Sequence, residues 1–444
     1  MKKVRGALFI LFGLFVLVVL APALDANIAE FDEVWKKRAN EAWKAAQEAY
    51  HPDPEQVNSH LNHHVHMALA GTNGTRRGLG NGFVMSGPCK ATNPIDRCWR
   101  CKKDWARNRK RLASCVLGFG RKTVGGKFGG YYVVTDPSDD DMMKPKPGTL
   151  RHAVIQEGPL WIIFGRSMVI SLTQELIMTS HKTIDGRGKN IHIAHGCGLT
   201  LQFVKNVIVH GLHIHDIRAG SGGMIRDSVK HYGFRTVSDG DAISIFGSVN
   251  IWIDHNSLST AKDGLIDVVE KSAAITISNN HMTHHDDVML LGASETQTGD
   301  KVMQITVAFN HFGRGLTQRL PRCRFGFFHV VNNDYTMWTM YAIGGSSNPT
   351  IISQGNRFVA PPTLSSKEVT KREYAFPNEW QSWTWRSQGD LFLNGAIFIP
   401  SGDQSKNYKV PFSKREVISA KSGVYAGRLS RYSGALVCTS AKPC

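Results

Sequence analysis

The sequence predicts an all-β protein, a right-handed parallel β-helix (solenoid) with a short helical N-terminal extension. The first observation is a repeat, because from about Ala153 onward short β-branched runs alternate with Asn, Gly and Asp residues. Five of these runs end in asparagines that are 24, 30, 23 and 23 residues apart, namely Asn256, Asn280, Asn310, Asn333 and Asn356. Since one short strand cannot bury its own apolar face, each unit must stack on the next.

The second observation is that the same residue type recurs at the same point of each unit. Parallel strands stacked in register would place the asparagines in a column, where amides one rung apart hydrogen-bond as a ladder. A β-sandwich with hairpins is the alternative, but Asn-Gly and similar hairpin dipeptides are largely missing between the units. The composition fits a folded protein with many tight turns, with 444 residues, 42% hydrophobic, 20% charged and 43 glycines.

Residues 1–23 are interpreted as a secretory signal peptide. Basic residues at Lys2, Lys3 and Arg5 precede an apolar run from Ala7 to Ala21, and small residues follow. A retained signal anchor is the alternative, although the apolar run is shorter than the ~20 residues that a membrane span needs. We therefore expect a secreted, extracellular protein that has no membrane contact after signal cleavage.

Residues 24–90 are expected to form a helical and polar extension, and residues 91–444 a β-helix domain with a C-terminal closing segment. Apolar residues at three- and four-residue steps predict an amphipathic helix over 28–50, which the prolines at 52 and 54 end. The stretch from there to about Gly87 shows weak periodicity. It carries a cluster of four histidines, either linker residues or a metal site, at His60, His63, His64 and His66.

The chain is strongly basic, with a formal net charge of +17, of which the signal peptide carries three basic residues and no acidic one. In the extracellular space a basic protein attracts any polyanion, such as acidic cell-wall polysaccharide, heparin-like chains or anionic membrane, so the charge does not indicate nucleic acid, and we do not expect nucleic acid as the partner. Much of the excess positive charge lies between Arg97 and Lys127, as either a solvated basic face or a binding patch. We expect a monomer.

The chain has eight cysteines, Cys89, Cys98, Cys101, Cys115, Cys197, Cys323, Cys438 and Cys444. In a cytosolic protein the pair Cys98-x-x-Cys101 would indicate zinc or a redox pair, but secretion favours disulfides. Their clustering predicts local disulfides within residues 89–115 and between Cys438 and the C-terminus. Asn73-Gly74-Thr75 is the one glycosylation acceptor, used or unused.

Two pairs of carboxylates lie about one coil apart, Asp239 and Asp241 before one strand, and Asp263 and Asp267 around the next. Residues one coil apart lie on adjacent rungs of a solenoid, so these four side chains can converge. They would repel one another unless a cation lay among them, and hard divalent cations prefer oxygen ligands. The pattern indicates a Ca²⁺ site, although turn-forming aspartates or a purely structural Ca²⁺ site remain open.

Three arginines follow within six positions, Arg319, Arg322 and Arg324. A dense arginine group beside an acidic calcium site suits a polyanion whose carboxylates bridge the metal and the guanidinium groups. Surface solubility would explain a single arginine but not three. Three tryptophans near the C-terminus, Trp380, Trp383 and Trp385, are expected to close the end of the core, with sugar stacking as the alternative.

From about Asn93 to Arg357 and beyond, the sequence resembles the plant pectate lyases of polysaccharide lyase family 1. The resemblance rests on NPIDRCWRC, YYVVTDPSDDD, KPGTLRHAVIQ, TIDGRG, DGDAISIFGS, WIDHNSLS, AITISNNH, QRLPRCRFG, HVVNNDYT, YAIGGSSNPTI and EVTKREY. The helical N-terminal segment is similar to the extension that some plant members carry. The resemblance implies a parallel β-helix, a cell-wall location and Ca²⁺-dependent cleavage of α-1,4-linked polygalacturonate by β-elimination, which gives unsaturated oligogalacturonides.

The resemblance also implies roles for single residues. Asp239, Asp263 and Asp267 match calcium ligands, and Asp241 is taken as a further ligand. Arg319 matches the general base, and Arg324, with Arg322 beside it, a contact to substrate carboxylates. Asp254 belongs to the signature as either a corner hydrogen-bonding residue or a catalytic one. The chain departs from the family at Asp287, where many members have a lysine expected to bind galacturonate.

The expected chemistry agrees with those roles. The C5 proton of a uronate lies next to a carboxylate and is barely acidic, so coordination of that carboxylate by Ca²⁺ and arginine must stabilise the charge that develops. Arginine holds its proton in nearly all contexts, so an alkaline optimum is expected for Arg319 as the base. Two other functions stay open, a polygalacturonase-like hydrolase with paired Asp residues and a pectate-binding protein without turnover.

Overall fold

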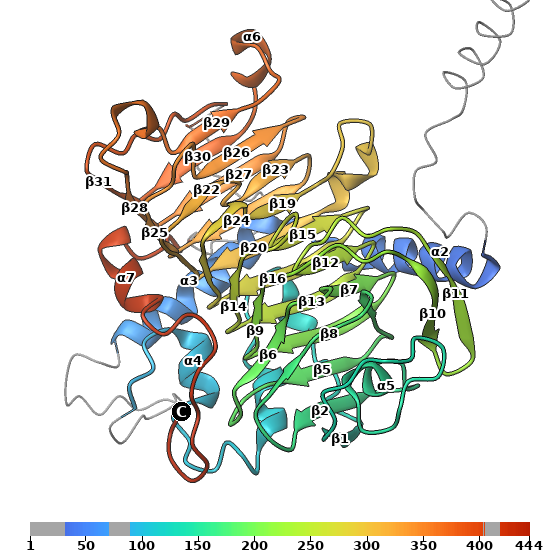
Figure 1. Cartoon of the computed structure of the whole chain (residues 1–444). Coiled ribbons are helices and arrows are strands. Elements are labelled where there is room, and N and C mark those ends of the chain that lie inside the picture. Colours follow the sequence, from blue (N-terminus) through green and yellow to red (C-terminus); the bar gives the residue numbers. More distant parts are fainter. Residues whose placement is uncertain (1–31, 71–88, 403, 405–417) are drawn as a thin grey trace, which may run out of the picture.

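The structure, a computed structural model, describes residues 32–70, 89–402, 404 and 418–444. Three parallel sheets run along a solenoid, and each coil contributes one strand to each sheet in turn (Figure 1). The predicted parallel β-helix and its short N-terminal helical region are therefore confirmed. The predicted signal peptide, residues 1–23, and the glycosylation acceptor Asn73 lie outside the described residues.

The three sheets are named here by size. Sheet A has ten strands, β1 Gly130–Val134, β2 Leu160–Phe164, β5 Lys182–Asp185, β8 Lys205–His210, β13 Val249–Asp254, β16 Ala273–Ser278, β20 Gln304–Ala308, β24 Phe327–Val331, β27 Thr350–Gln354 and β30 Trp385–Gln388. Sheet B has nine strands, β3 Met168–Ile170, β6 Ile191–Ala194, β9 His213–His215, β14 Ser257–Ser259, β17 His281–Thr283, β21 His311–Phe312, β25 Asp334–Thr336, β28 Arg357–Val359 and β31 Leu391–Leu393. Sheet C has eight strands, β4 Leu176–Ile177, β7 Leu199–Gln202, β12 Ile243–Phe246, β15 Ile266–Val269, β19 Met289–Leu291, β23 Arg322–Arg324, β26 Ile343–Ser346 and β29 Thr370–Arg372.

Two short sheets interrupt the coils. An antiparallel hairpin is made of β10, Gly223–Ser228, and β11, His231–Arg235. A parallel pair is made of β18, His285–Asp287, and β22, Leu316–Gln318. Both small sheets lie in connections between strands of sheets B and C, so they flank the outer face of sheet C.

The asparagine column predicted from the repeat is present as a buried ladder along the solenoid. The side-chain amide of each asparagine donates to the side-chain oxygen of the asparagine in the next coil, over 3.1 Å from Asn256 to Asn280 and 3.0 Å from Asn333 to Asn356. The ladder passes through Asn310 and ends on the carboxylate of Asp390. It fixes which residues of successive coils become neighbours.

The helices lie outside the solenoid. They are α2 Glu33–Ala49, α3 Pro54–Ala70, α4 Pro94–Trp99, α5 Leu150–Val154, α6 Pro377–Trp380 and α7 Ala426–Leu429, with 3₁₀ turns η2 Arg109–Ser114, η3 Phe119–Lys122, η4 Thr298–Val302, η5 Leu364–Ser366 and η6 Gly423–Tyr425. Among the described residues, no helix is both long enough and apolar enough to cross a bilayer.

The first predicted helix is confirmed as α2. Asp32 caps its N-terminus by accepting a hydrogen bond from the backbone N–H of Val34. The indole of the buried Trp35 donates to Asp227 on the hairpin over 3.0 Å, and the guanidinium of Arg38 lies 2.9 Å from the same carboxylate. Helix α2 therefore holds the β10–β11 hairpin, whose C-terminal end leads into the Asp239–Asp241 loop.

The chain after residue 54, which shows only weak periodicity in the sequence, forms a full helix, α3. Its buried apolar residues, Val57, Leu61, Val65 and Leu69, recur at four-residue steps. Histidines and the buried Asn58 and Asn62 interrupt that pattern in the sequence, and Asn62 is accommodated by donating to Gln354 over 3.0 Å. The helical period was missed because buried asparagines count as polar in the sequence, and their partner lies in a distant coil.

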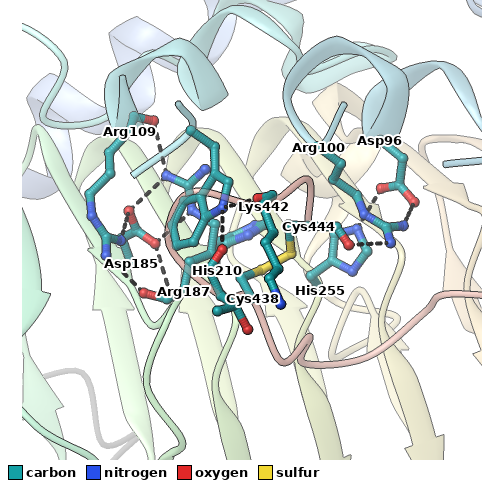
Figure 2. The surroundings of a disulfide bond; sticks show 12 residues. Asp96, Arg100, Arg109, Asp185, Arg187, His210, His255, Cys438, Lys442 and Cys444 are labelled. Atoms are coloured by element: carbon teal, nitrogen blue, oxygen red, sulfur yellow. Dashed lines mark hydrogen bonds and ion pairs between the residues drawn. A yellow bond between two sulfur atoms is a disulfide. The ribbon is translucent and has the colours of Figure 1, made fainter. Parts of the chain in front are cut away.

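A layer made of residues 89–128 and the C-terminus covers the outer face of sheet A. Two disulfides, Cys89–Cys101 and Cys98–Cys115, link this layer internally, and Cys438–Cys444 closes the C-terminal loop beneath it (Figure 2). The predicted local disulfides are confirmed, while Cys197 and Cys323 are buried free thiols. Trp383 and Trp385 are buried in the main core, as expected for residues that close its end.

Candidate active site

The carboxylates predicted to converge do so beside sheet C. Asp239 and Asp241 lie in the loop before β12, and Asp263 lies in the loop before β15. One carboxylate oxygen from each of these three lies within 4.8 Å of the others. Asp267 is on β15 itself, in register with Ser244 of β12 and Leu290 of β19. The stacking of adjacent coils therefore brings the two pairs together.

Backbone groups hold the buried carboxylates in place. The N–H of Gly264 donates to Asp241 over 2.8 Å, and the N–H of Leu290 donates to Asp267 over 3.2 Å. A Cβ atom at Gly264 would lie 2.2 Å from an Asp267 oxygen and 3.0 Å from an Asp241 oxygen. Glycine is therefore required at this position, because any side chain would displace the two carboxylates.

The carboxylates are costly to ionise together. Burial, followed by the charge of Asp263, raises the pKa of Asp267 to about 8. Burial and the charge of Asp267 also raise the pKa of Asp241 well above its usual range. A divalent cation would remove this repulsion, and the donor set is all oxygen, which suits Ca²⁺. Among the described residues, Asp239, Asp241 and Asp263 are the group that gathers three such ligand atoms.

Two arginines lie on β23, two strands along the same sheet from β15. Arg322 on β23 lies in register with Leu290 of β19, two rungs from Asp267. Its guanidinium forms an ion pair of 3.0 Å with Glu373, which follows β29. The guanidinium of Arg324 donates to the carbonyl of Gly292 over 2.7 Å. Both arginines are buried, so their positions are fixed by the sheet.

Arg319 lies between β22 and β23 and is paired with Asp287. The β18–β22 pairing sets Asp287 beside Gln318, the residue before Arg319. The guanidinium Nε of Arg319 lies 3.1 Å from a carboxylate oxygen of Asp287, and the two side chains are 23% and 26% exposed. The residue at which the chain departs from the family pattern is thus in direct contact with the expected base.

Several buried polar atoms around these arginines have no hydrogen-bond partner among the described residues. They include Nε and Nη2 of Arg322, Nε of Arg324 and the hydroxyl of Tyr341. The Tyr341 ring lies just before β26, and burial, followed by the charge of Glu373, raises its pKa. Sequence reasoning missed Tyr341 and Glu373, although counting one coil onward from the arginines would have reached Tyr341 and two coils onward Glu373.

Asp254 lies elsewhere. It ends β13 of sheet A and is fully buried, where its carboxylate accepts hydrogen bonds from Ser278 over 2.6 Å and Asn279 over 2.9 Å, and lies 2.9 Å from Nδ1 of His210. Of the two roles left open by the sequence, the structure shows the hydrogen-bonding one. Asp254 is on a different sheet from the four carboxylates.

Comparison with known proteins agrees with this geometry. A family model described as "Pectate lyase, N terminus" matches residues 27–79, and one described as "Pectate lyase" matches residues 170–428. The crystal structure of jun a 1, the major allergen from cedar pollen, superposes with a TM-score of 0.74 at 46% identity, covering 78% of this chain and 99% of that one. A thermostable pectate lyase at 20% identity and a TM-score of 0.53, covering 72% of this chain and 96% of that one, shares the fold.

The sequence relatives extend over the whole chain. A pectate lyase of Lilium longiflorum is 61% identical over 440 residues, which cover 99% of this chain and 100% of that protein. A probable pectate lyase of Arabidopsis thaliana is 53% identical over 460 residues, 96% of each chain. Because one family model spans more than half of the sequence and these relatives match it nearly end to end, the chain belongs to the pectate lyase family.

Proposed function

We propose that this pectate lyase is secreted and cleaves α-1,4-linked polygalacturonate by Ca²⁺-dependent β-elimination, which releases unsaturated oligogalacturonides. The observation that carries the proposal is that three carboxylates converge beside Asp267 on sheet C, while two arginines lie on β23, two strands further along, and Arg319 lies in the connection just before β23. Such an arrangement binds a cation and a polyuronate side by side. A polygalacturonase-like hydrolase would need the paired carboxylates but neither the cation nor Arg319.

Asp239, Asp241, Asp263 and Asp267 would hold the Ca²⁺ ion. When bound, the ion would withdraw electron density from a uronate carboxylate and make the neighbouring C5 proton easier to remove. The protein then contributes fixed positive charge, because Arg322 and Arg324 are held by Glu373 and by the Gly292 carbonyl. Several of their N–H groups have no hydrogen-bond partner among the described residues; these atoms are buried, so the two side chains would have to shift before a substrate carboxylate could reach them.

Arg319 would take the C5 proton. The electron pair of the C5–H bond then forms the C4–C5 double bond, the bond from C4 to the glycosidic oxygen breaks, and that oxygen acquires a proton. In the free protein the Arg319 side chain is engaged with Asp287 at 3.1 Å. This ion pair must open, or shift, before the guanidinium can face the substrate, so Asp287 opposes both polyuronate binding and the action of Arg319.

The first test is the product. Purified mature protein incubated with polygalacturonate should generate the ultraviolet absorbance of a conjugated, unsaturated sugar, lose this activity with a chelator and recover it with Ca²⁺. The reason is that the uronate carboxylate needs the cation for its α-proton to become removable. New reducing ends without that absorbance would show the hydrolase instead, and binding without either product would show a pectate-binding protein.

The calcium assignment is tested by Asp267→Asn. With a folded-state pKa of about 8 against about 4 when unfolded, the calcium-free protein binds more protons folded than unfolded between these values. Its free energy of unfolding should therefore fall as the pH rises from about 4 to 8, and Asp267→Asn should flatten that fall. The variant should also weaken Ca²⁺ binding by about tenfold or more, measured by calorimetry. The exposed Asp286→Asn is the control, and equal behaviour of the two variants would contradict the assignment.

The role of Arg319 is tested by Arg319→Lys, which keeps the charge but changes the geometry and the base. Turnover of polygalacturonate should fall by at least ~10²-fold, the usual scale for a positioned acid–base group. Arg314→Lys, an exposed position in the same connection, is the matched control and should retain turnover. Wild-type turnover in Arg319→Lys would exclude Arg319 as the base.

The Asp287 ion pair is tested by Asp287→Asn and Asp287→Lys. Both free Arg319 and remove a negative charge from the path of a polyuronate, so KM for polygalacturonate should fall by about threefold or more, with the larger effect for lysine. Asp286→Asn, a neighbouring exposed acid, should change KM less. Weaker binding together with a lower calcium response would instead show that Asp286 and Asp287 bind a bridging Ca²⁺.

A further inference from the structure

The basic segment between residues 97 and 127 does not contribute to the site on sheet C. It belongs to the layer over the outer face of sheet A, where residues 99–111 and Tyr131 of the edge strand β1 line a hollow of about 550 Å³. That volume lies within the usual range of ligand pockets, about 300–1,000 Å³. The lining consists of Trp99, Lys102, Asp104, Trp105, Arg107, Asn108, Lys110, Arg111, Tyr131 and Arg187.

The floor of this pocket is rigid. The guanidinium of Arg187 lies 4.8 Å from the ring centre of Trp99 and 5.5 Å from that of Trp105, and it is tied to Asp185 over 2.7 Å. The Trp105 indole donates to the carbonyl of Lys442 over 3.1 Å, so the loop closed by the C-terminal disulfide supports it. All of these floor groups are buried except the loop residue. The floor therefore does not need a ligand to become ordered.

The rim is positive and partly aromatic. Lys102 and Arg107 are exposed, and the side chain of neither forms a hydrogen bond or ion pair with another described residue. Lys110 lies 4.7 Å from the ring centre of Tyr131, whose side chain is 48% exposed. The one acidic residue in the lining, Asp104, accepts a hydrogen bond from Asn108. The pocket thus combines cations with an accessible aromatic ring, which can contact the face of a sugar.

We propose that this pocket is a second, calcium-independent binding site for the acidic polysaccharide, which takes galacturonate units by ion pairing to Lys102 and Arg107 and by contact with Tyr131. The identity of the ligand rests on the proposed function, while the pocket itself does not. A polyuronate chain suits this pocket because its carboxylates can pair with the rim cations while its apolar ring faces contact the Tyr131 ring.

The two sites lie on different sheets, so a long polygalacturonate chain can occupy both while a short oligomer occupies one. Binding at the pocket then raises the effective concentration of polymer at the arginines without changing the chemical step. The consequence is a dependence on chain length. Loss of the pocket should raise KM for polymer and leave KM and turnover for short oligomers unchanged.

The experiment measures binding of polygalacturonate to the full mature protein in a chelator, so that calcium-mediated binding at the carboxylates is absent. The pocket variant is Lys102→Ala/Arg107→Ala, and the charge-matched control is Lys103→Ala/Lys122→Ala, two exposed lysines of the same segment outside the lining. The pocket variant should lose about fivefold or more in affinity and the control about twofold or less. Tyr131→Ala should also weaken binding, whereas Phe128→Ala, a nearby exposed aromatic outside the lining, should not.

Equal losses in the two double variants would overturn the site, because a diffuse basic field would explain them. Undetectable binding in the chelator would overturn it as well. Binding of poly-glutamate and of dextran sulfate is measured in the same way. If the pocket variant loses as much affinity for either of them as it loses for polygalacturonate, the uronate assignment is overturned. The product assay separates this proposal from the proposed function. If the pocket variant still forms unsaturated product in a calcium-dependent reaction and its KM for polymer is unchanged, the proposed lyase function stands and the second site is overturned.

Discussion

The asparagine ladder is the interaction on which the arrangement of the other parts depends. Each amide donates to the next asparagine and to a carbonyl of the preceding coil, and each side-chain oxygen accepts a backbone N–H, as Asn280 and Asn310 show. These groups are fully buried. A slip of one residue would leave several of them unpaired at about 1–3 kcal/mol each, so the register of adjacent coils is fixed. Fixed register is what makes residues of one coil neighbours of residues in the next.

The candidate active site depends on the same register, but unlike the ladder it leaves buried polar groups without hydrogen-bond partners among the described residues. The same stacking that pairs amides on one corner sets Asp267, Leu290 and Arg322 side by side on sheet C. There the carboxylates repel one another and arginine N–H groups stay unpartnered among the described residues. A site for a cation and a polyanion must hold such groups ready before the ligand arrives, and the rigid coils below tolerate the cost.

The sequence predicted those features that follow from the repeat. The β-helix, the ladder, the convergence of Asp239, Asp241 and Asp263, and the local disulfides all depend on spacing along the chain. It did not predict α3, whose buried Asn62 is satisfied by a residue about 290 positions away. Nor did it predict the Asp287–Arg319 ion pair, because that contact depends on the two-strand pairing of β18 with β22. Contacts between side chains of two different connections are not reflected in the sequence repeat, so spacing cannot predict them.

The sequence also could not predict which basic residues between 97 and 127 are neutralised by ion pairs and which are exposed. Arg100 and Arg109 look like Lys102 and Arg107 in the sequence, yet Arg100 forms an ion pair with the buried Asp96 and Arg109 with the buried Asp185 (Figure 2). Arg109 ties the layer to sheet A, because Asp185 lies on β5, whereas Arg100 and Asp96 both belong to the layer; in each pair the charge is neutralised within the protein. The positive charge that remains for a polyanion is carried by exposed residues, with Lys102 and Arg107 at the rim of the Trp105 pocket and Lys103 and Lys122 outside it. The solenoid keeps that charge on one sheet and the arginines of the active site on another.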